Sequence, residues 1–242
     1  MKVKNILASG CSFTQDGMGG LPPTLTHQGG NSYREDVNYP AATPRSWASF
    51  LAKKIDPDSF VNLATSGHGN YLVSKTIYDM LQVYDYNPEN TLVIFNISQM
   101  ARMDVVCEYN TENDFVTWTQ DILNYSFLKP DSPKWSKVMY DYEDDIKELI
   151  CYNNIKLSKL FEYLNTNKYP FVFTTLADYE DMPVIQENKE HYVQLPGNGM
   201  QEYAHSLGLL DEDGFHPNLE AQDLISKVAY DFICEKYNIE EN

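Results

Sequence analysis

Short apolar runs and stretches with helical spacing alternate along the chain. Four runs have the length and the Val, Ile and Phe content of buried strands: residues 3–9, 60–64, 91–97 and 170–176. Apolar side chains recur at helical spacing in residues 46–55, 71–84, 143–164 and 219–237. This order predicts an α/β fold, in which an open, mostly parallel sheet carries helices on both faces.

Two segments interrupt the alternation. Residues 16–45 are rich in Gly, Pro, Asn and Thr, and residues 101–141 carry Trp118 and Trp135 without a clear period. We expect residues 101–141 to be an irregular insertion that forms a rim or lid, with its tryptophans packed in a core rather than stacked on a sugar. Since no repeat or domain boundary is evident, residues 1–242 are expected to form a single domain.

The charge of the chain limits its partners. It holds 35 acidic and 18 basic residues, which gives a formal net charge of -17. Binding to nucleic acid or to an anionic membrane depends on clustered Lys and Arg, so we expect neither partner. The acidity is typical of a soluble surface, and selection of a cationic substrate is the alternative.

Cysteine and histidine spacing gives no sign of a metal centre or a disulfide framework. The four cysteines lie far apart without a CxxC pair, and the five histidines lack metal-ligand spacing. We therefore expect reduced thiols and no metal. The first apolar run is too short for a signal peptide, and no run reaches the roughly 18 apolar residues of a membrane span. A cytoplasmic location is expected, with a virion component as the alternative.

A serine follows the first predicted strand directly, in the stretch ILASGCSFT. Ligands of such sheets bind outside the carboxyl ends of the strands, so Ser12 lies where chemistry is usually done. A serine hydroxyl becomes a useful nucleophile only beside a base that is oriented by a third group, with donors for the developing oxyanion. Ser12 therefore needs partners from elsewhere in the chain.

The best candidate for the base lies in the stretch DEDGFHPN, just before the last predicted helix. Pro217 suits the first turn of that helix, which leaves His216 at its entrance and Asp213 three residues earlier on a loop bent by Gly214. This spacing allows the carboxylate to orient the imidazole. Alternatively, Asp213 caps the helix and His216 is a surface residue.

Three blocks together resemble the SGNH (GDSL) hydrolase family: GCSF at residues 10–13, NLATSG at 62–67 and DGFHP at 213–217. They fall in the family's order. The resemblance implies a three-layer α/β/α fold of the flavodoxin-like type, with Ser12 as nucleophile, His216 as general base and Asp213 as its orienting acid. It also implies an oxyanion hole that includes the Ser12 N–H and Gly67, ester substrates, and no metal or organic cofactor.

The chain departs from the family pattern in two places. Cys11 replaces the aspartate of the first block; a buried residue behind the turn is expected, and a reactive thiol is the alternative. The third block, usually Gly-x-Asn-Asp, is replaced by FNISQMAR. Gln99 lies nearest the donor asparagine of that block and offers the same amide, while Asn96 and Ser98 are alternatives.

Two further residues are candidates for substrate binding. Arg102 could hold a carboxylate or phosphate of the substrate, or pair with a loop acid such as Asp104. His68 follows Gly67 and could line the rim of the site, although a solvated loop histidine is the expected case.

The first hypothesis is a serine esterase that hydrolyses a small acyl ester, with an O-acetylated carbohydrate preferred because the loops are polar. Its partner would be a small-molecule or carbohydrate ester. The alternatives are a lipase, thioesterase or acyltransferase of the same family, or a weakly active or inactive binding or structural module, for example of a phage particle.

Overall fold

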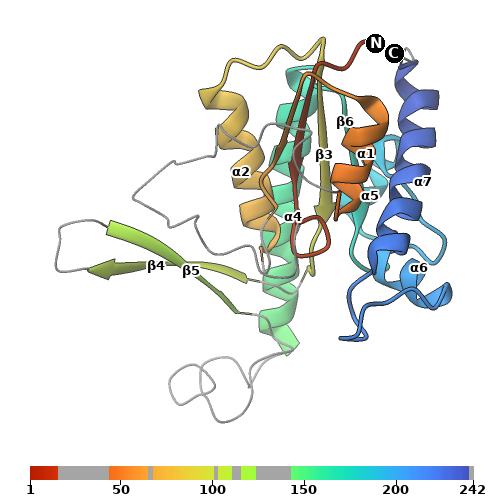
Figure 1. The fold of residues 1–242 in the computed structure, drawn as a ribbon. Helices are drawn as coiled ribbons and strands as arrows, with labels where there is room; N and C mark the ends of the chain where they lie inside the picture. The colour runs from red at the N-terminus through yellow and green to blue at the C-terminus, as the bar shows by residue number, and fades with distance from the viewer. Residues whose placement is uncertain (16–43, 65–67, 101–102, 111–115, 124–142, 240–242) are drawn as a thin grey trace.

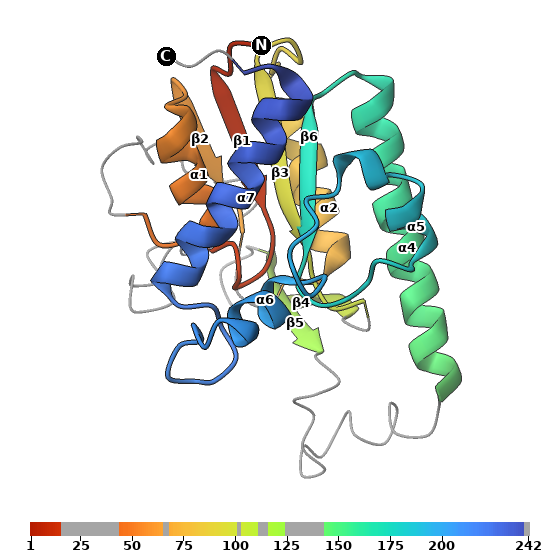
Figure 2. The ribbon, with the colours of Figure 1, turned by 90° about the vertical axis from the view of Figure 1, so that its right-hand side faces the viewer.

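The main sheet has four parallel strands. In the computed structural model, which describes residues 1–15, 44–64, 68–100, 103–110, 116–123 and 143–239, the strands are β1 (Asn5–Ser9), β2 (Ser59–Asn62), β3 (Thr91–Ile97) and β6 (Phe171–Thr175). Their order is β2-β1-β3-β6, as Figure 2 shows from left to right. The chain moves to one side of β1 first and to the other side afterwards, so the order switches between β1 and β3. Ligands of such sheets bind at this switch, outside the carboxyl ends of the strands.

Helices cover both faces of the sheet (Figures 1 and 2). Helices α1 (Trp47–Ile55) and α7 (Leu219–Tyr237) lie on one face, and α2 (Asn70–Val83) and α4 (Glu143–Thr166) on the other. Alternate strand residues supply the two cores: Ile6 and Ala8 pack with α1 and α7, whereas Leu7 packs with α2 and α4. Because helices cover both faces of the sheet, the strands are buried on both sides, which explains their continuous apolar sequences. The predicted three-layer α/β/α fold is confirmed.

The helix that follows the His216 loop starts two residues later than Pro217. Asn218 is the N-cap of α7, and its side chain accepts a hydrogen bond from the N–H of Ala221 at 3.0 Å. Pro217 therefore precedes the cap instead of lying in the first turn, and Asp213 does not cap the helix. An asparagine oxygen satisfies an unpaired first-turn N–H, which explains why the cap lies here. No helix of the described residues is long and apolar enough to cross a membrane.

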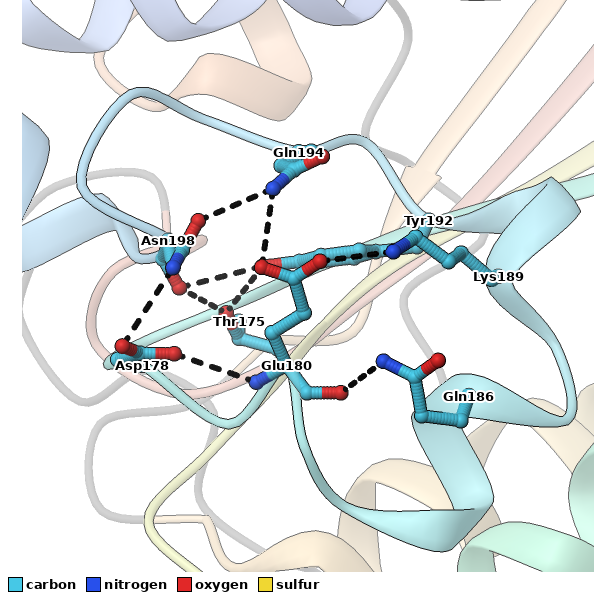
Figure 3. A network of polar contacts seen from close by, with 8 residues as sticks. All are labelled: Thr175, Asp178, Glu180, Gln186, Lys189, Tyr192, Gln194 and Asn198. Atoms are coloured by element: carbon cyan, nitrogen blue, oxygen red, sulfur yellow. Dashed lines mark hydrogen bonds and ion pairs between the residues drawn. The ribbon is translucent and has the colours of Figure 1, made fainter.

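Three short helical elements follow β6 and lack a sequence signal: α5 (Pro183–Gln186), the 3-10 turn η1 (Lys189–His191) and α6 (Met200–Ser206). Polar contacts hold much of this region together, as Figure 3 shows for Thr175, Asp178, Glu180, Gln186, Lys189, Tyr192, Gln194 and Asn198. Tyr192 forms a parallel bridge to Phe173, at the position beside β6 that a fifth strand would take.

The expectation of an irregular insertion at residues 101–141 is wrong in part. It contains two antiparallel strands, β4 (Met103–Asn110) and β5 (Val116–Leu123), which form a separate sheet (Figure 1). The first stretch holds two Val and a Tyr, and the second holds Val, Ile, Trp and two Thr; these residue types favour strands. Trp118 pairs with Glu108 in the register of this sheet, while Trp135 lies outside the described residues.

Candidate active site

Ser12 lies in a tight turn at the carboxyl end of β1. The carbonyl of Cys11 accepts hydrogen bonds from the N–H groups of Thr14 at 3.0 Å and Gln15 at 3.1 Å. The turn is entered through Gly10, whose φ is 158°, and a Cβ there would lie 2.1 Å from Oδ1 of Asn96. Only glycine allows this close approach, so Gly10 is needed for the turn to sit against β3.

Ser12, His216 and Asp213 form a continuous line of hydrogen bonds. Ser12 Oγ lies 2.8 Å from His216 Nε2, and His216 Nδ1 lies 2.5 Å from Asp213 Oδ2. A carboxylate only accepts hydrogen bonds, so Nδ1 carries the proton that faces Asp213 and Nε2 is left to accept from Ser12. The structure thus brings together the three residues expected from the sequence, although they come from opposite ends of the chain.

Asp213 is strongly held as a carboxylate. Its Oδ1 accepts hydrogen bonds from the N–H groups of Phe215 at 2.8 Å and His216 at 2.9 Å. The bonds that His216 donates, from its backbone and its ring, lower the pKa of Asp213 to about 2. The carboxylate therefore remains charged at neutral pH and can stabilise an imidazolium.

The loop that carries His216 is closed on itself. The N–H of Asp211 donates to the carbonyl of His216 at 2.7 Å, and the N–H of Asn218 donates to the carbonyl of Leu209 at 2.9 Å. The imidazole also packs against two aromatic rings that contact each other, with centroid distances of 4.9 Å to Phe13 and 5.1 Å to Phe215. These contacts restrict the ring to the orientation that faces Ser12.

The turn that carries Ser12 is fixed by side chains from three neighbouring elements. Asn96 of β3 accepts hydrogen bonds from the N–H of Cys11 and the hydroxyl of Thr14. Trp47 of α1 donates from its indole to the same hydroxyl at 2.9 Å, and Asn62 of β2 donates to the carbonyl of Thr14 at 2.8 Å. Side chains held in this way are suited to a site that needs fixed geometry.

The donors of the expected oxyanion hole are described only in part. The backbone N–H of Ser12 has no acceptor among the described residues, which leaves it available. Gly67 and Arg102 lie outside the described residues. Gln99 is half-buried, and within the described part of the chain no hydrogen bond joins its side chain to the Ser12 turn.

The alternatives to Gln99 are both buried. Asn96 is fully buried beneath the Ser12 turn, where its amide is already bonded. Ser98 is buried too, and its N–H donates to Oδ1 of Asn70 at 2.8 Å. Asn70, at the start of α2, also donates to the carbonyl of Ser98 at 3.3 Å. The residues after β3 are therefore anchored by Asn70, a residue for which the sequence offered no role.

Cys11 and His68 are both buried, which was expected for the first and not for the second. Cys11 is fully buried, as expected for a residue that packs behind the turn, and its Sγ lies 3.4 Å from Nδ2 of Asn96. The expectation of a solvated His68 is wrong, because its exposed fraction is 6%. His68 lies directly before Gly69, the N-cap of α2.

Several solved structures resemble this chain in fold. A psychrotrophic esterase, EstA, from a Pseudoalteromonas species is 14% identical over 97% of this chain and 99% of its own, with a TM-score of 0.48. TesA is 14% identical over 96% and 99%, with a TM-score of 0.49. A lipolytic protein of the G-D-S-L family from Veillonella parvula is 11% identical over 97% and 98%, with a TM-score of 0.44. No family model and no curated protein sequence matches the chain.

Proposed function

We propose that the protein is a serine esterase that hydrolyses a small acyl ester. One observation carries the proposal: Ser12 Oγ lies 2.8 Å from His216 Nε2, while Asp213 holds the other ring nitrogen at 2.5 Å. This is the arrangement that a serine needs to lose its proton as it attacks an acyl carbon. The proposal rests on these contacts and not on the distant structural likenesses.

The reaction would proceed through an acyl-enzyme. Ser12 Oγ attacks the carbonyl carbon while His216 Nε2 takes the hydroxyl proton, and Asp213 stabilises the imidazolium. His216 then returns the proton to the leaving alcohol as the C–O bond breaks. Water attacks the acyl-enzyme with His216 again as base, and the acid leaves with Ser12 restored.

The negative oxygen of the tetrahedral intermediate needs donors. The N–H of Ser12, which lacks an acceptor among the described residues, supports a place for this oxygen beside the serine. We propose Gly67 and the amide of Gln99 as the further donors. Loss of one such donor typically costs about 100- to 1,000-fold in kcat, so each is separately testable.

An O-acetylated carbohydrate is the proposed substrate class. Its support is the polar sequence of residues 16–45, which follow Ser12 directly and are rich in Gly, Pro, Asn and Thr. Arg102 is proposed to contact the substrate beyond the acyl group, whereas His68, with an exposed fraction of 6%, is not. A short acyl chain would then be preferred over a long one.

The test compares p-nitrophenyl acetate with butyrate and octanoate esters, using the parent, Ser12→Ala, His216→Ala and Cys11→Ala. We expect activity that falls with acyl length, is abolished in the first two variants and is retained in the third. Release of acetate from acetylated xylan would then test the carbohydrate. Activity that survives Ser12→Ala would overturn the mechanism, and a parent inactive on every ester would favour a binding module.

A further inference from the structure

Asn96 lies at the centre of the contacts that shape the Ser12 turn. It is the polar residue among the otherwise apolar residues 92–97 of strand β3, and its side chain is fully buried. Its Oδ1 accepts the N–H of Cys11 at 3.0 Å and the hydroxyl of Thr14 at 2.7 Å. A buried polar side chain is nearly always hydrogen-bonded, since burying it without partners is unfavourable. The partners of Asn96 are Cys11, directly before Ser12, and Thr14, two residues after it.

The direction of these hydrogen bonds is fixed by the chemistry of the groups. The Trp47 indole N–H can only donate a hydrogen bond, and it donates to Thr14 Oγ1 at 2.9 Å. The single hydroxyl proton of Thr14 is then free to point at Asn96 Oδ1. With two donors on its oxygen, the Asn96 amide can take one orientation, and its Nδ2 faces Cys11 Sγ at 3.4 Å.

These contacts determine where the N–H of Ser12 points. Asn96 holds the N–H of Cys11, while Thr14 and Gln15 hold its carbonyl. In a trans peptide the C=O and the following N–H point in opposite directions. The carbonyl of Cys11 points into the turn, so the N–H of Ser12 points out of it.

We propose that Asn96 and Thr14 are positioning residues, which together fix the Ser12 hydroxyl against His216 and aim the Ser12 N–H at the oxyanion. This inference rests on the proposed function of Ser12. The line from Trp47 through Thr14 and Asn96 to Cys11 joins α1, the Ser12 turn and β3. We expect these two residues to affect the rate of the chemical step, because both side chains are fully buried.

The sharpest test is a pair of substitutions at Thr14. Thr14→Val keeps the shape and removes the hydroxyl, whereas Thr14→Ser keeps the hydroxyl. For p-nitrophenyl acetate we expect Thr14→Val to lower kcat by about 10- to 100-fold with little change in KM, since small misplacements of reacting groups have effects of this size. Thr14→Ser should stay within about threefold of the parent, because the same hydrogen bonds remain possible.

Asn96→Ala tests the other residue, with Asn188→Ala as its control. Asn188 is also a buried asparagine and donates to a backbone carbonyl at 2.9 Å, but it lies after α5, away from the Ser12 turn. Both variants should lose thermal stability, while only Asn96→Ala should lose kcat. Equal losses of kcat in both, or parent-like kcat in Thr14→Val, would overturn the inference.

A second readout separates this inference from the proposed function. A fluorophosphonate labels an activated serine: the Ser12 Oγ–P bond forms, the P–F bond breaks, fluoride leaves and the hydroxyl proton passes to His216. The labelling rate, followed by intact mass, does not depend on the ester chosen. If the parent is labelled but hydrolyses no ester, the proposed esterase function is wrong while Ser12 is still activated. In that case, slower labelling of Thr14→Val would still support the positioning role. Equal labelling of parent and Thr14→Val, or none in the parent, would overturn it.

Discussion

Gln222 of α7 accepts a hydrogen bond from the backbone N–H of Trp47 at 2.8 Å, and its Nε2 donates to the carbonyl of Phe13 at 3.3 Å. One buried side chain therefore joins the start of α1 to the residue that follows Ser12. Gln222 also lies in the first turns of the helix that His216 precedes. Besides the Ser12–His216 hydrogen bond, Gln222 therefore links the turn that carries Ser12 to the helix that follows His216.

Gln222→Ala is expected to weaken both the fold and the site. It leaves the N–H of Trp47 buried without its acceptor, which typically costs about 1–3 kcal/mol of unfolding free energy. Gln222→Glu is the matched variant, since its carboxylate can still accept from Trp47 but cannot donate to Phe13. Urea unfolding should rank the parent above both variants, and an unchanged midpoint for Gln222→Ala would contradict the role given to this side chain.

Asn70 should act on the oxyanion through Gln99. Its fully buried amide bonds both backbone groups of Ser98, so Asn70→Ala frees the segment that carries Gln99. We expect Gln99→Ala to lower kcat by about 100-fold or more, and Asn70→Ala to lower it in the same direction. If the two act through one donor, the double variant should be little worse than Gln99→Ala alone. Fully additive losses would show that Asn70 acts elsewhere.

Asp213→Asn should leave the loop nearly unchanged in shape and still impair catalysis. The amide cannot stabilise an imidazolium and favours the wrong ring tautomer, so a loss of kcat on the order of 10,000-fold is expected. Because the folded pKa of Asp213 is lowered from 3.8 to about 2, its charge stabilises the fold above the unfolded value. This contribution is lost as the pH falls. The stability difference between parent and variant should therefore shrink from about pH 5 to about pH 2, and a constant gap would contradict the lowered pKa.

His191 should make the fold sensitive to acid at the end of the sheet opposite Ser12. Its ring stacks on Phe171 at 3.8 Å, and burial, followed by the charge of Lys236, lowers its pKa below 6.5. The folded state favours neutral His191, so its contribution to stability is present above the unfolded pKa and is lost as the pH falls.

His191→Phe keeps a ring on Phe171 and removes the titrating group. The parent should lose stability relative to this variant when the pH is lowered from about 7.5 to about 5, as thermal unfolding across that range would report. Parallel pH profiles for the two proteins would exclude His191 as the acid-sensitive group.

Much of the fold could be predicted from the sequence, because its strongest patterns are long and buried. Strand β3 and helix α7 have the predicted bounds of 91–97 and 219–237. The contact of Ser12 with His216 was also predictable, since the ends of parallel strands and the loops beyond them meet at one edge. The catalytic roles of these residues and of Gly67 stay predictions.

Other features depend on contacts that no local pattern contains. Helix α6 has seven residues, too few for a clear period, and the hairpin of β4 and β5 was hidden by its polar residues. Asn96 did carry a signal, as a polar residue within the apolar run TLVIFNI. Its partners lie about eighty residues away, so the sequence showed a buried amide without showing what it bonds.

The close approach of Gly10 to Asn96 makes these two positions interdependent. A Cβ at position 10 would overlap Oδ1 of Asn96 and would also lie 2.7 Å from Oγ1 of Thr14. A natural relative with alanine at position 10 must therefore carry smaller or shifted side chains at both 14 and 96. Positions 10, 14 and 96 should therefore change together among relatives. This covariation would help to identify distant relatives even where the residues that follow β3 have changed.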